Sequence, residues 1–300
     1  MSTPTPAARS PHRALALMAV AVGLALAAAP ALTPAAEAPL HLVLTPSQKP
    51  TDLIEGGEAF GAALGKIIGI PVRVTVASDY AAVIEAMRNH TADLGFLHPV
   101  GYVLASREAK ARIVARNIWH GKSTFTSRIF VRKDSGIKKL EDLRGKTMAF
   151  VDPASSSGYT YPMVMLIQQG LVKNRDPKTF FREVLFAGGH DAVMRALANG
   201  HVDAAAAFDL AAERYLTPAE RERVVWIAES PDIPESGISA RDGLDPAVVA
   251  KVRAGLFKMN APEYAPILKK MYDIDGFAPA DDRDYDPVRA AVELLGVRPR

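Results

Sequence analysis

Apolar positions along this 300-residue chain follow two different spacings. Short apolar runs at residues 40–44, 72–76 and 93–97 are typical of β-strands. Between them, apolar residues recur every three or four positions, as on one face of a helix, starting near Phe60 and near Val83. This strand–helix–strand order predicts an α/β fold with mostly parallel sheets covered by helices.

A second series of the same kind follows in the middle of the chain. Strands are predicted at residues 129–131, 148–151, 184–187, 202–208 and 224–228. A helix is predicted over Asp191–Asn199, ending before Gly200, and another is predicted to begin at Asp245-Pro246. The last third of the chain is expected to be helical.

Two series of strands in a chain of this length predict two lobes. The segments Ser127–Asp134 and Ser230–Gly237 are expected to be the crossings between them. We therefore expect residues 37–128 together with 236–300 to form a first lobe and residues 129–235 to form a second.

The first 36 residues are predicted to be a secretory signal peptide. Arg9 and Arg13 precede an apolar run over residues 14–29, and small residues such as Ala31 and Ala36 offer cleavage sites. The run is short for a membrane span, and no cysteine follows it that could carry a lipid. We expect an exported, periplasmic protein without a stable membrane insertion.

Composition excludes several kinds of chemistry. The chain has no cysteine, which excludes disulfides, thiolate metal sites and cysteine nucleophiles. The formal charge is +3, and about +1 remains without Arg9 and Arg13. No basic run with interleaved aromatic residues is present, so nucleic-acid binding is not expected.

A candidate binding site lies where the predicted strand 148–151 leads into a helix. The sequence from Asp152 to Tyr159 reads DPASSSGY. The first N–H groups of a helix lack internal partners and carry partial positive charge. Serine hydroxyls add donors, and glycine lets a ligand approach the backbone. The stretch predicts a site for phosphate, a phosphonate or sulfate; the alternative is a turn whose last serine caps the helix.

Further segments occur in a fixed order along the chain: ASDY at 77–80, EAMR at 85–88, ADLGFL at 92–97, SSSGY at 155–159, FAGGHD at 186–191, ANGHVD at 198–203 and IP at 233–234. Together they resemble the periplasmic substrate-binding proteins of phosphate/phosphite/phosphonate ABC transporters. The resemblance covers residues 40–260. It implies a two-lobed periplasmic binding protein fold, with a hinge and a ligand cleft between the lobes.

The resemblance also implies ligand-binding residues. Ser155, Ser156 and Ser157 match the serine/threonine motif that grips the anion at a helix N-terminus. His190 matches a histidine that reaches the same anion from a neighbouring strand end. Tyr80 matches an aromatic position facing the cleft. For His190 and Tyr80, a purely structural role is the alternative.

The sequence departs from the family pattern at two places. His98 stands where many relatives have a small residue, and we expect it to contact the ligand rather than to lie in a surface loop. Relatives that take aminoalkyl phosphonates have an aspartate just after the Ile-Pro pair. Here Ser236 takes that place and Glu235 is one residue out of register. A buried ammonium needs a carboxylate partner, so aminoethylphosphonate is not the first expectation.

Three functions other than transport are alternatives for an exported α/β protein. A serine hydrolase needs Gly-x-Ser-x-Gly, and Ala154 replaces the first glycine. A metal-dependent phosphatase needs clustered ligands, whereas His90, His98 and His120 are scattered. A soluble ligand sensor that docks on a membrane receptor is an alternative that the sequence does not separate from transport. We expect no enzyme activity, no cofactor and no metal, but a monomer that binds a small oxyanion and an ABC permease.

Overall fold

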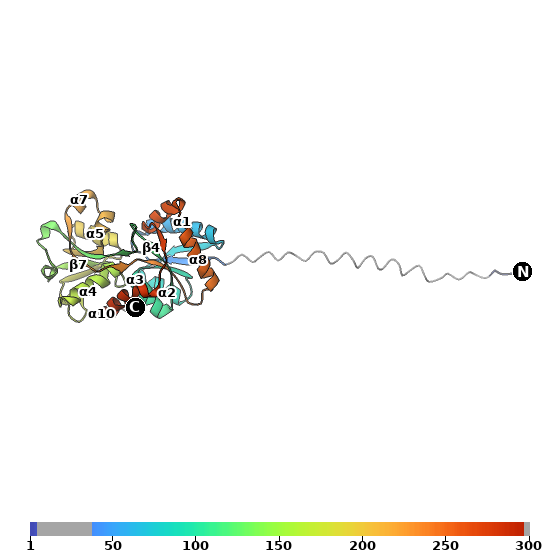
Figure 1. Ribbon diagram of the computed structural model, residues 1–300, viewed down its shortest axis with the longest axis horizontal. Coiled ribbons are helices and arrows are strands. Elements are labelled where there is room, and N and C mark those ends of the chain that lie inside the picture. Colours follow the sequence, from blue (N-terminus) through green and yellow to red (C-terminus); the bar gives the residue numbers. More distant parts are fainter. Residues whose placement is uncertain (5–37, 297–300) are drawn as a thin grey trace. The chain divides into compact units, whose positions relative to one another are not determined.

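The computed structural model describes residues 1–4 and 38–296 of the chain. It divides the chain into Met1–Glu37 and Ala38–Arg300, and the second unit holds the helices and strands (Figure 1). Apart from its first four residues, the predicted signal peptide lies outside the described residues. No described helix combines the length and the apolar character that crossing a bilayer requires.

Two sheets organise residues 38–296. The first has the strand order β13-β4-β12-β3-β1-β2, with β1 Leu40–Leu44, β2 Val72–Val76, β3 Leu94–Leu97, β4 Arg112–Ile118, β12 Gly237–Ala240 and β13 Gly276–Ala278. The second has the order β10-β6-β9-β7-β8, with β6 Ser127–Arg132, β7 Thr147–Phe150, β8 Glu183–Phe186, β9 Ala204–Phe208 and β10 Val224–Glu229. We call the two sheets with their helices the first and the second lobe.

Both sheets are mixed, so the prediction of mostly parallel strands holds for only part of each. In the first sheet, β1 pairs in parallel with β2 and β3, whereas β12 and β13 pair antiparallel. In the second sheet, β7 pairs in parallel with β8 and β9, whereas β6 and β10 pair antiparallel. Two of the antiparallel strands, β6 and β12, directly follow the places where the chain crosses between the sheets.

Helices cover both sheets. Those of the first lobe are α1 Pro50–Ile68, α2 Tyr80–Arg88, α3 Pro99–Ala109, α8 Pro246–Lys258 and α9 Ala265–Tyr272. Those of the second are α4 Tyr161–Gln168, α5 His190–Ala198, α6 Ala211–Tyr215 and α7 Pro218–Arg221. The predicted helix start at Asp245 is confirmed as a cap, and Asp79 caps α2 in the same way, since each carboxylate accepts a hydrogen bond from a backbone N–H. Gly200 follows α5 with φ of +75°, as the predicted C-terminal stop requires.

A short antiparallel pair joins the lobes. Strand β5 (Thr124–Phe125) lies between β4 and β6 in sequence and pairs with β11 (Ile233–Pro234), which lies between β10 and β12. The predicted crossing at Ser230–Gly237 therefore contains β11. The predicted crossing at Ser127–Asp134 is wrong, because β6 already belongs to the second sheet and the change of sheet precedes it.

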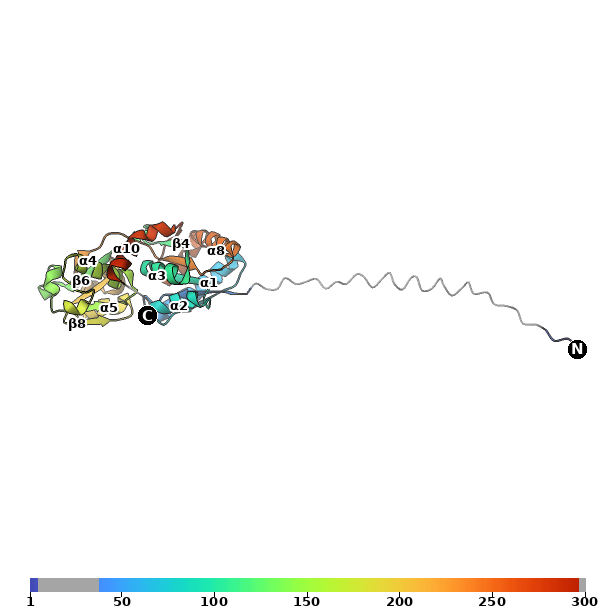
Figure 2. The ribbon, with the colours of Figure 1, turned by 90° about the horizontal axis from the view of Figure 1, so that it is seen from below.

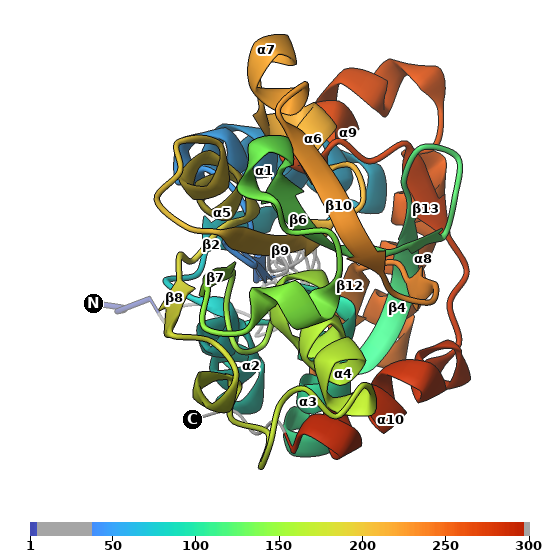
Figure 3. The same cartoon turned by 90° about the vertical axis from the view of Figure 1, so that its left-hand side faces the viewer.

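The last helix, α10 (Asp286–Leu295), lies against both lobes. It packs on α3 of the first lobe and on α4 of the second (Figures 1 and 2). Val288 and Val292 are buried in a cluster that also holds residues of both sheets, while Leu295 is buried beside the second-lobe core. The end-on view in Figure 3 shows α3, α4 and α10 at one edge. The final helix is thus a further link between the lobes.

Candidate functional site

The serine stretch lies at the start of a helix, as predicted. Residues Ser156–Thr160 form one π-helical turn that continues into α4. The cap is the first serine rather than the last: the hydroxyl of Ser155 accepts a hydrogen bond of 3.1 Å from the N–H of Gly158. All three serines are at most 3% exposed. A π-turn displaces backbone groups from regular helical bonding and often marks a functional site.

Ser156 also reaches across to the first lobe. Its hydroxyl oxygen accepts a hydrogen bond of 3.0 Å from the N–H of Val100, in the first turn of α3. The hydroxyl proton of Ser156 is then free to point at a ligand oxygen. The same serine therefore joins the two lobes and offers a donor to the cleft.

His190 lies at the start of α5 and is 6% exposed. Its backbone N–H donates to the carbonyl of Ser47 in the first lobe at 3.2 Å. Its ring contacts Phe208, with centroids 5.0 Å apart, and Nδ1 is buried without a partner among the described residues. Burial, with smaller effects of His98 and Arg214, lowers the pKa of His190 to about 3. The imidazole is therefore neutral and keeps hydrogen-bonding capacity for a ligand.

His98 caps the N-terminus of α3 and is not in a surface loop. Its Nδ1 shares a hydrogen bond of 2.7 Å with the hydroxyl of Ser236, and its Nε2 is buried without a described partner. Burial lowers the pKa of His98 to about 4, so this ring is also neutral. Tyr80, the first residue of α2, packs beside it with ring centroids 5.6 Å apart.

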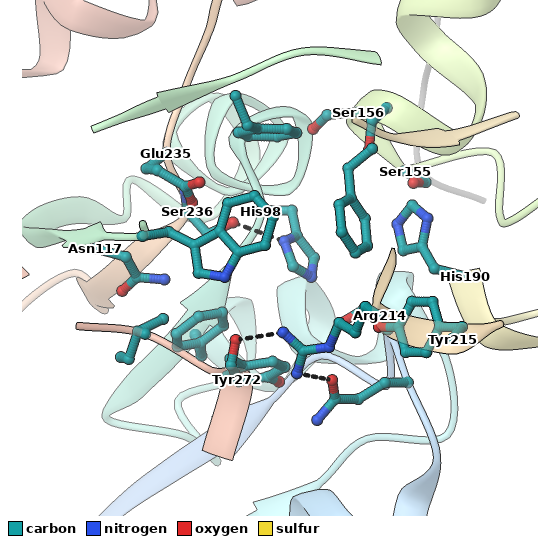
Figure 4. Close-up of a pocket in the computed structure, with 18 residues that line it drawn as sticks. His98, Asn117, Ser155, Ser156, His190, Arg214, Tyr215, Glu235, Ser236 and Tyr272 are labelled. Carbon is teal, nitrogen blue, oxygen red and sulfur yellow. Dashed lines mark hydrogen bonds between the residues drawn. The ribbon is translucent and has the colours of Figure 1, made fainter. Parts of the chain in front are cut away.

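A cavity of about 80 Å³ lies between these residues (Figure 4). On this measure of volume one water molecule needs roughly 10–15 Å³, so the space holds several waters or one compact anion. His98, Ser155, Ser156, Ser157 and His190 line the cavity. Tyr80 does not line it, although its hydroxyl is buried without a hydrogen-bond partner among the described residues. The structure therefore brings five of the six predicted residues together and places Tyr80 behind His98.

The predicted residues share one position in the fold, the start of a helix. Tyr80 begins α2, His98 precedes α3, Ser155 precedes the π-turn, and His190 begins α5. The positive ends of the helix dipoles therefore converge on the cavity from both lobes. Backbone dipoles and neutral side chains at these positions can stabilise an anion through hydrogen bonds.

Sequence reasoning missed much of the cavity wall: Ser47, Gln48, Phe96, Asn117, Trp119, Phe125, Phe208, Arg214, Tyr215, Tyr272 and Ile274 line it, and Glu235 and Ser236 were not expected to bind. Most lie in strand ends and connections that carry no motif. Trp119 precedes a tight turn in which His120 and Gly121 both have positive φ, and its ring meets Phe208 of the second lobe at 5.4 Å. The pair closes one side of the cavity.

Glu235 is the acidic residue of the cavity wall. It is 6% exposed, its carboxylate accepts a bond of 3.0 Å from the N–H of Ser236, and its carbonyl accepts one from the hydroxyl of Tyr285. Burial raises the pKa of Glu235 to about 8; the Ser236 N–H opposes this effect and Asp209 adds to it. At neutral pH the carboxyl group is therefore protonated and can donate to an anion.

The geometry does not favour a serine hydrolase. Ser155 and Ser156 accept hydrogen bonds from backbone N–H groups, and in the described part of the chain neither is bonded to a histidine. A nucleophilic serine needs such a base within hydrogen-bond reach. Within residues 1–4 and 38–296, no group of three or more potential metal ligands is found either.

The variant His190→Gln is expected to keep most of the affinity for an anion and to resist acid better than wild type. Because the folded-state pKa is below the unfolded-state value of 6.5, the unfolded state binds more protons, and stability falls as pH falls towards 3. At about 1.4 kcal/mol per pKa unit, the variant should be spared roughly 2–3 kcal/mol of this loss by about pH 4. Denaturant titrations of both proteins at several pH values measure this difference in the free energy of unfolding.

An exposed histidine of the same lobe provides the control. His201→Gln makes the same substitution at an exposed side chain that does not line the cavity, and it is compared with His190→Gln at each pH. Parallel curves for His190→Gln and wild type would show that the His190 ring does not stay neutral on folding.

Sequence comparison adds the family. Residues 42–285 match the family described as the periplasmic phosphonate substrate-binding protein of an ABC transporter. The chain is 32% identical over 285 residues to "Phosphate-import protein PhnD" of Mycolicibacterium smegmatis, which covers 86% of each chain. It is 28% identical over 251 residues to the "Phosphonates-binding periplasmic protein" of Escherichia coli, covering 78% of this chain and 70% of that one.

A solved structure agrees in fold. A binding protein component of an ABC phosphonate transporter from Pseudomonas aeruginosa superposes with a TM-score of 0.77 at 25% identity, covering 86% of both chains. The two-lobed arrangement predicted from the resemblance is therefore confirmed. With the match over residues 42–285, this chain belongs to the periplasmic substrate-binding proteins of phosphonate ABC transporters.

Proposed function

We propose that this protein captures a compact phosphorus oxyanion, such as phosphate, phosphite or a phosphonate, in the cavity between its lobes and delivers it to an ABC permease. The observation that carries the proposal is the convergence of helix N-termini on buried serines and neutral histidines. These groups donate hydrogen bonds without competing negative charge. The names of the relatives, one for phosphate import and one for phosphonates, agree with it.

The proposal includes the site residues Tyr80, His98, Ser155, Ser156, Ser157 and His190. Tyr80 acts by holding the His98 ring, which it contacts. The protein works in the periplasm as a monomer after its signal peptide is removed, and it performs no catalysis. Glu235 lines the cavity, so aminoethylphosphonate is a candidate ligand whose ammonium group would have to displace the proton of this carboxyl group.

Binding is accompanied by closure of the lobes, taken as residues 37–128 with 236–300 and residues 129–235. Hydrogen bonds cross the cleft from Val100 to Ser156, from His190 to Ser47, and from Arg214 to Gln48 and Tyr272. An anion held from both sides favours the closed state, since only that state completes its contacts.

Replacing Ser156 by alanine tests the proposal. The variant loses a donor to the anion and the acceptor for Val100 N–H. Hydrogen bonds to charged groups contribute roughly 1.5–3 kcal/mol, so affinity should fall about tenfold to a hundredfold. Calorimetry with phosphate, phosphite, methylphosphonate, aminoethylphosphonate and sulfate measures it, after a thermal-shift screen has ranked these anions on wild type.

The control is Ser78→Ala, which removes an exposed hydroxyl outside the cavity. It should bind as wild type does. If no phosphorus anion stabilises the wild-type protein, or if Ser156→Ala binds as tightly as wild type while folded, the proposed site is wrong.

A further inference from the structure

Arg214 is the cationic side chain of the cavity wall; the other described residues that line it carry no positive charge at neutral pH. Serine hydroxyls, backbone N–H groups and neutral imidazoles stabilise a singly or a doubly charged anion through the same hydrogen bonds. A guanidinium group adds a full charge, and its attraction grows in proportion to the charge of the ligand. Selection by ligand charge therefore depends on Arg214.

The guanidinium group of Arg214 is fixed by the opposite lobe. Arg214 belongs to α6 of the second lobe, and its partners belong to the first. One terminal nitrogen donates to the side-chain oxygen of Gln48 at 2.8 Å. The other donates to the carbonyl of Tyr272 at 3.1 Å and lies 3.4 Å from the carboxylate of Asp273. These contacts exist only when the lobes are together, so closure positions the charge.

The guanidinium group of Arg214 keeps an N–H donor for a ligand. An arginine has five N–H donors, and the contacts described above leave Nε–H without a hydrogen-bond partner among the described residues. Figure 4 shows Arg214 in the cavity wall between Tyr215 and Tyr272. Its charge acts on the His190 ring, since it contributes to lowering the pKa of that histidine. Arg214 and His190 both line the cavity.

We propose that Arg214 is the residue that selects ligands whose phosphoryl group carries two negative charges, and that it does so in the closed state, where Gln48 and Tyr272 hold it. This inference rests on the proposed function. The ligand class that follows is a fully ionised phosphonate or phosphate rather than a singly charged diester or sulfonate.

Methylphosphonate and methanesulfonate test the proposal because they share shape and size. Above the second ionisation of the phosphonate, the first carries two charges and the second carries one. Calorimetry at that pH compares wild type, Arg214→Gln and Gln48→Leu. Arg214→Gln should weaken methylphosphonate binding about tenfold to a hundredfold, because it removes a charged hydrogen-bond partner. Methanesulfonate binding should weaken only about threefold to tenfold, since a single charge gains half as much free energy from the guanidinium as a double charge does.

Gln48→Leu separates charge selection from a mechanical link between the lobes. It removes one anchor of Arg214 but keeps the positive charge, so it should weaken both ligands by the same factor. If methanesulfonate binds wild type too weakly to measure, the comparison uses methylphosphonate alone. The loss of methylphosphonate affinity should then be larger in Arg214→Gln than in Gln48→Leu. The control Arg195→Gln removes a charge from the same lobe outside the cavity, where Arg195 pairs with Asp191, and should change neither affinity.

The outcomes distinguish the two proposals. If wild type binds none of phosphate, phosphite and phosphonates, the proposed function fails. If wild type binds methylphosphonate but Arg214→Gln weakens both ligands equally, Arg214 only joins the lobes and the inference is overturned. Equal losses of methylphosphonate affinity in Arg214→Gln and Gln48→Leu would have the same meaning.

Discussion

Replacing Gly158 by alanine is expected to disrupt the serine turn and to abolish tight anion binding. A Cβ atom at this position would lie 2.4 Å from Cγ2 and 2.5 Å from Cβ of Val151, and 2.8 Å from the hydroxyl of Ser155. Val151 is buried, and its backbone N–H donates to the carbonyl of Gly158, so neither side can move easily. Overpacking of this kind costs about 1–3 kcal/mol of stability.

Gly101 offers the matched control. It lies in α3, beside the cavity, and a Cβ atom there would meet only Leu97 at the ordinary distance of 3.5 Å. Alanine in a helix should stabilise the protein by about 0.4–1 kcal/mol. Thermal unfolding and calorimetry of both variants decide the matter. A Gly158→Ala protein with wild-type melting temperature and affinity would show that the turn tolerates a side chain.

The variant Glu235→Gln is expected to be more stable than wild type at alkaline pH and to bind anions without a decline there. The folded-state pKa, about 8, lies above the unfolded-state value of 4.5. The stability that Glu235 contributes is therefore complete below pH 4.5 and is lost as pH rises through about 8. The variant cannot ionise, so its advantage at alkaline pH should reach roughly 1–3 kcal/mol.

The affinity for anions is also expected to depend on the ionisation of Glu235. In wild type, ionisation of Glu235 places a negative charge in the cavity wall, so affinity should fall as pH rises past about 8. Calorimetry in buffers of different ionisation heat should also detect a proton taken up with the anion near this pH. Identical alkaline profiles for the variant and wild type would mean that Glu235 does not face the bound anion.

Periodic elements were predictable from the sequence because their burial is local and regular. The strand Leu40–Leu44 was predicted with its actual bounds, and the helix start at Asp245 was predicted from a cap followed by proline. Strands β12 and β13 were missed, since they are four and three residues long and lie in a region otherwise rich in helices. Their strand state depends on pairing with β4, which no local pattern shows.

The residues of the candidate site also fall into those that the sequence predicts and those that it does not. Ser155, Ser156 and Ser157 form a continuous motif next to a predicted helix start, so hydroxyl chemistry and position pointed to one place. Arg214 and Glu235 have no such neighbours in sequence. Arg214 lies in a five-residue helix, and its role arises from contacts with residues 48 and 272, far away along the chain. Long-range contacts of this kind exist only in the folded lobes.

The position of α10 has a consequence for how this protein unfolds. Its apolar face contributes to the buried cluster shared by both sheets through Val292 and to the second-lobe core through Leu295. Neither lobe can expose its interior without also stripping this helix from the other. We therefore expect the two lobes to unfold in one cooperative transition, so that a bound anion raises the melting temperature of both.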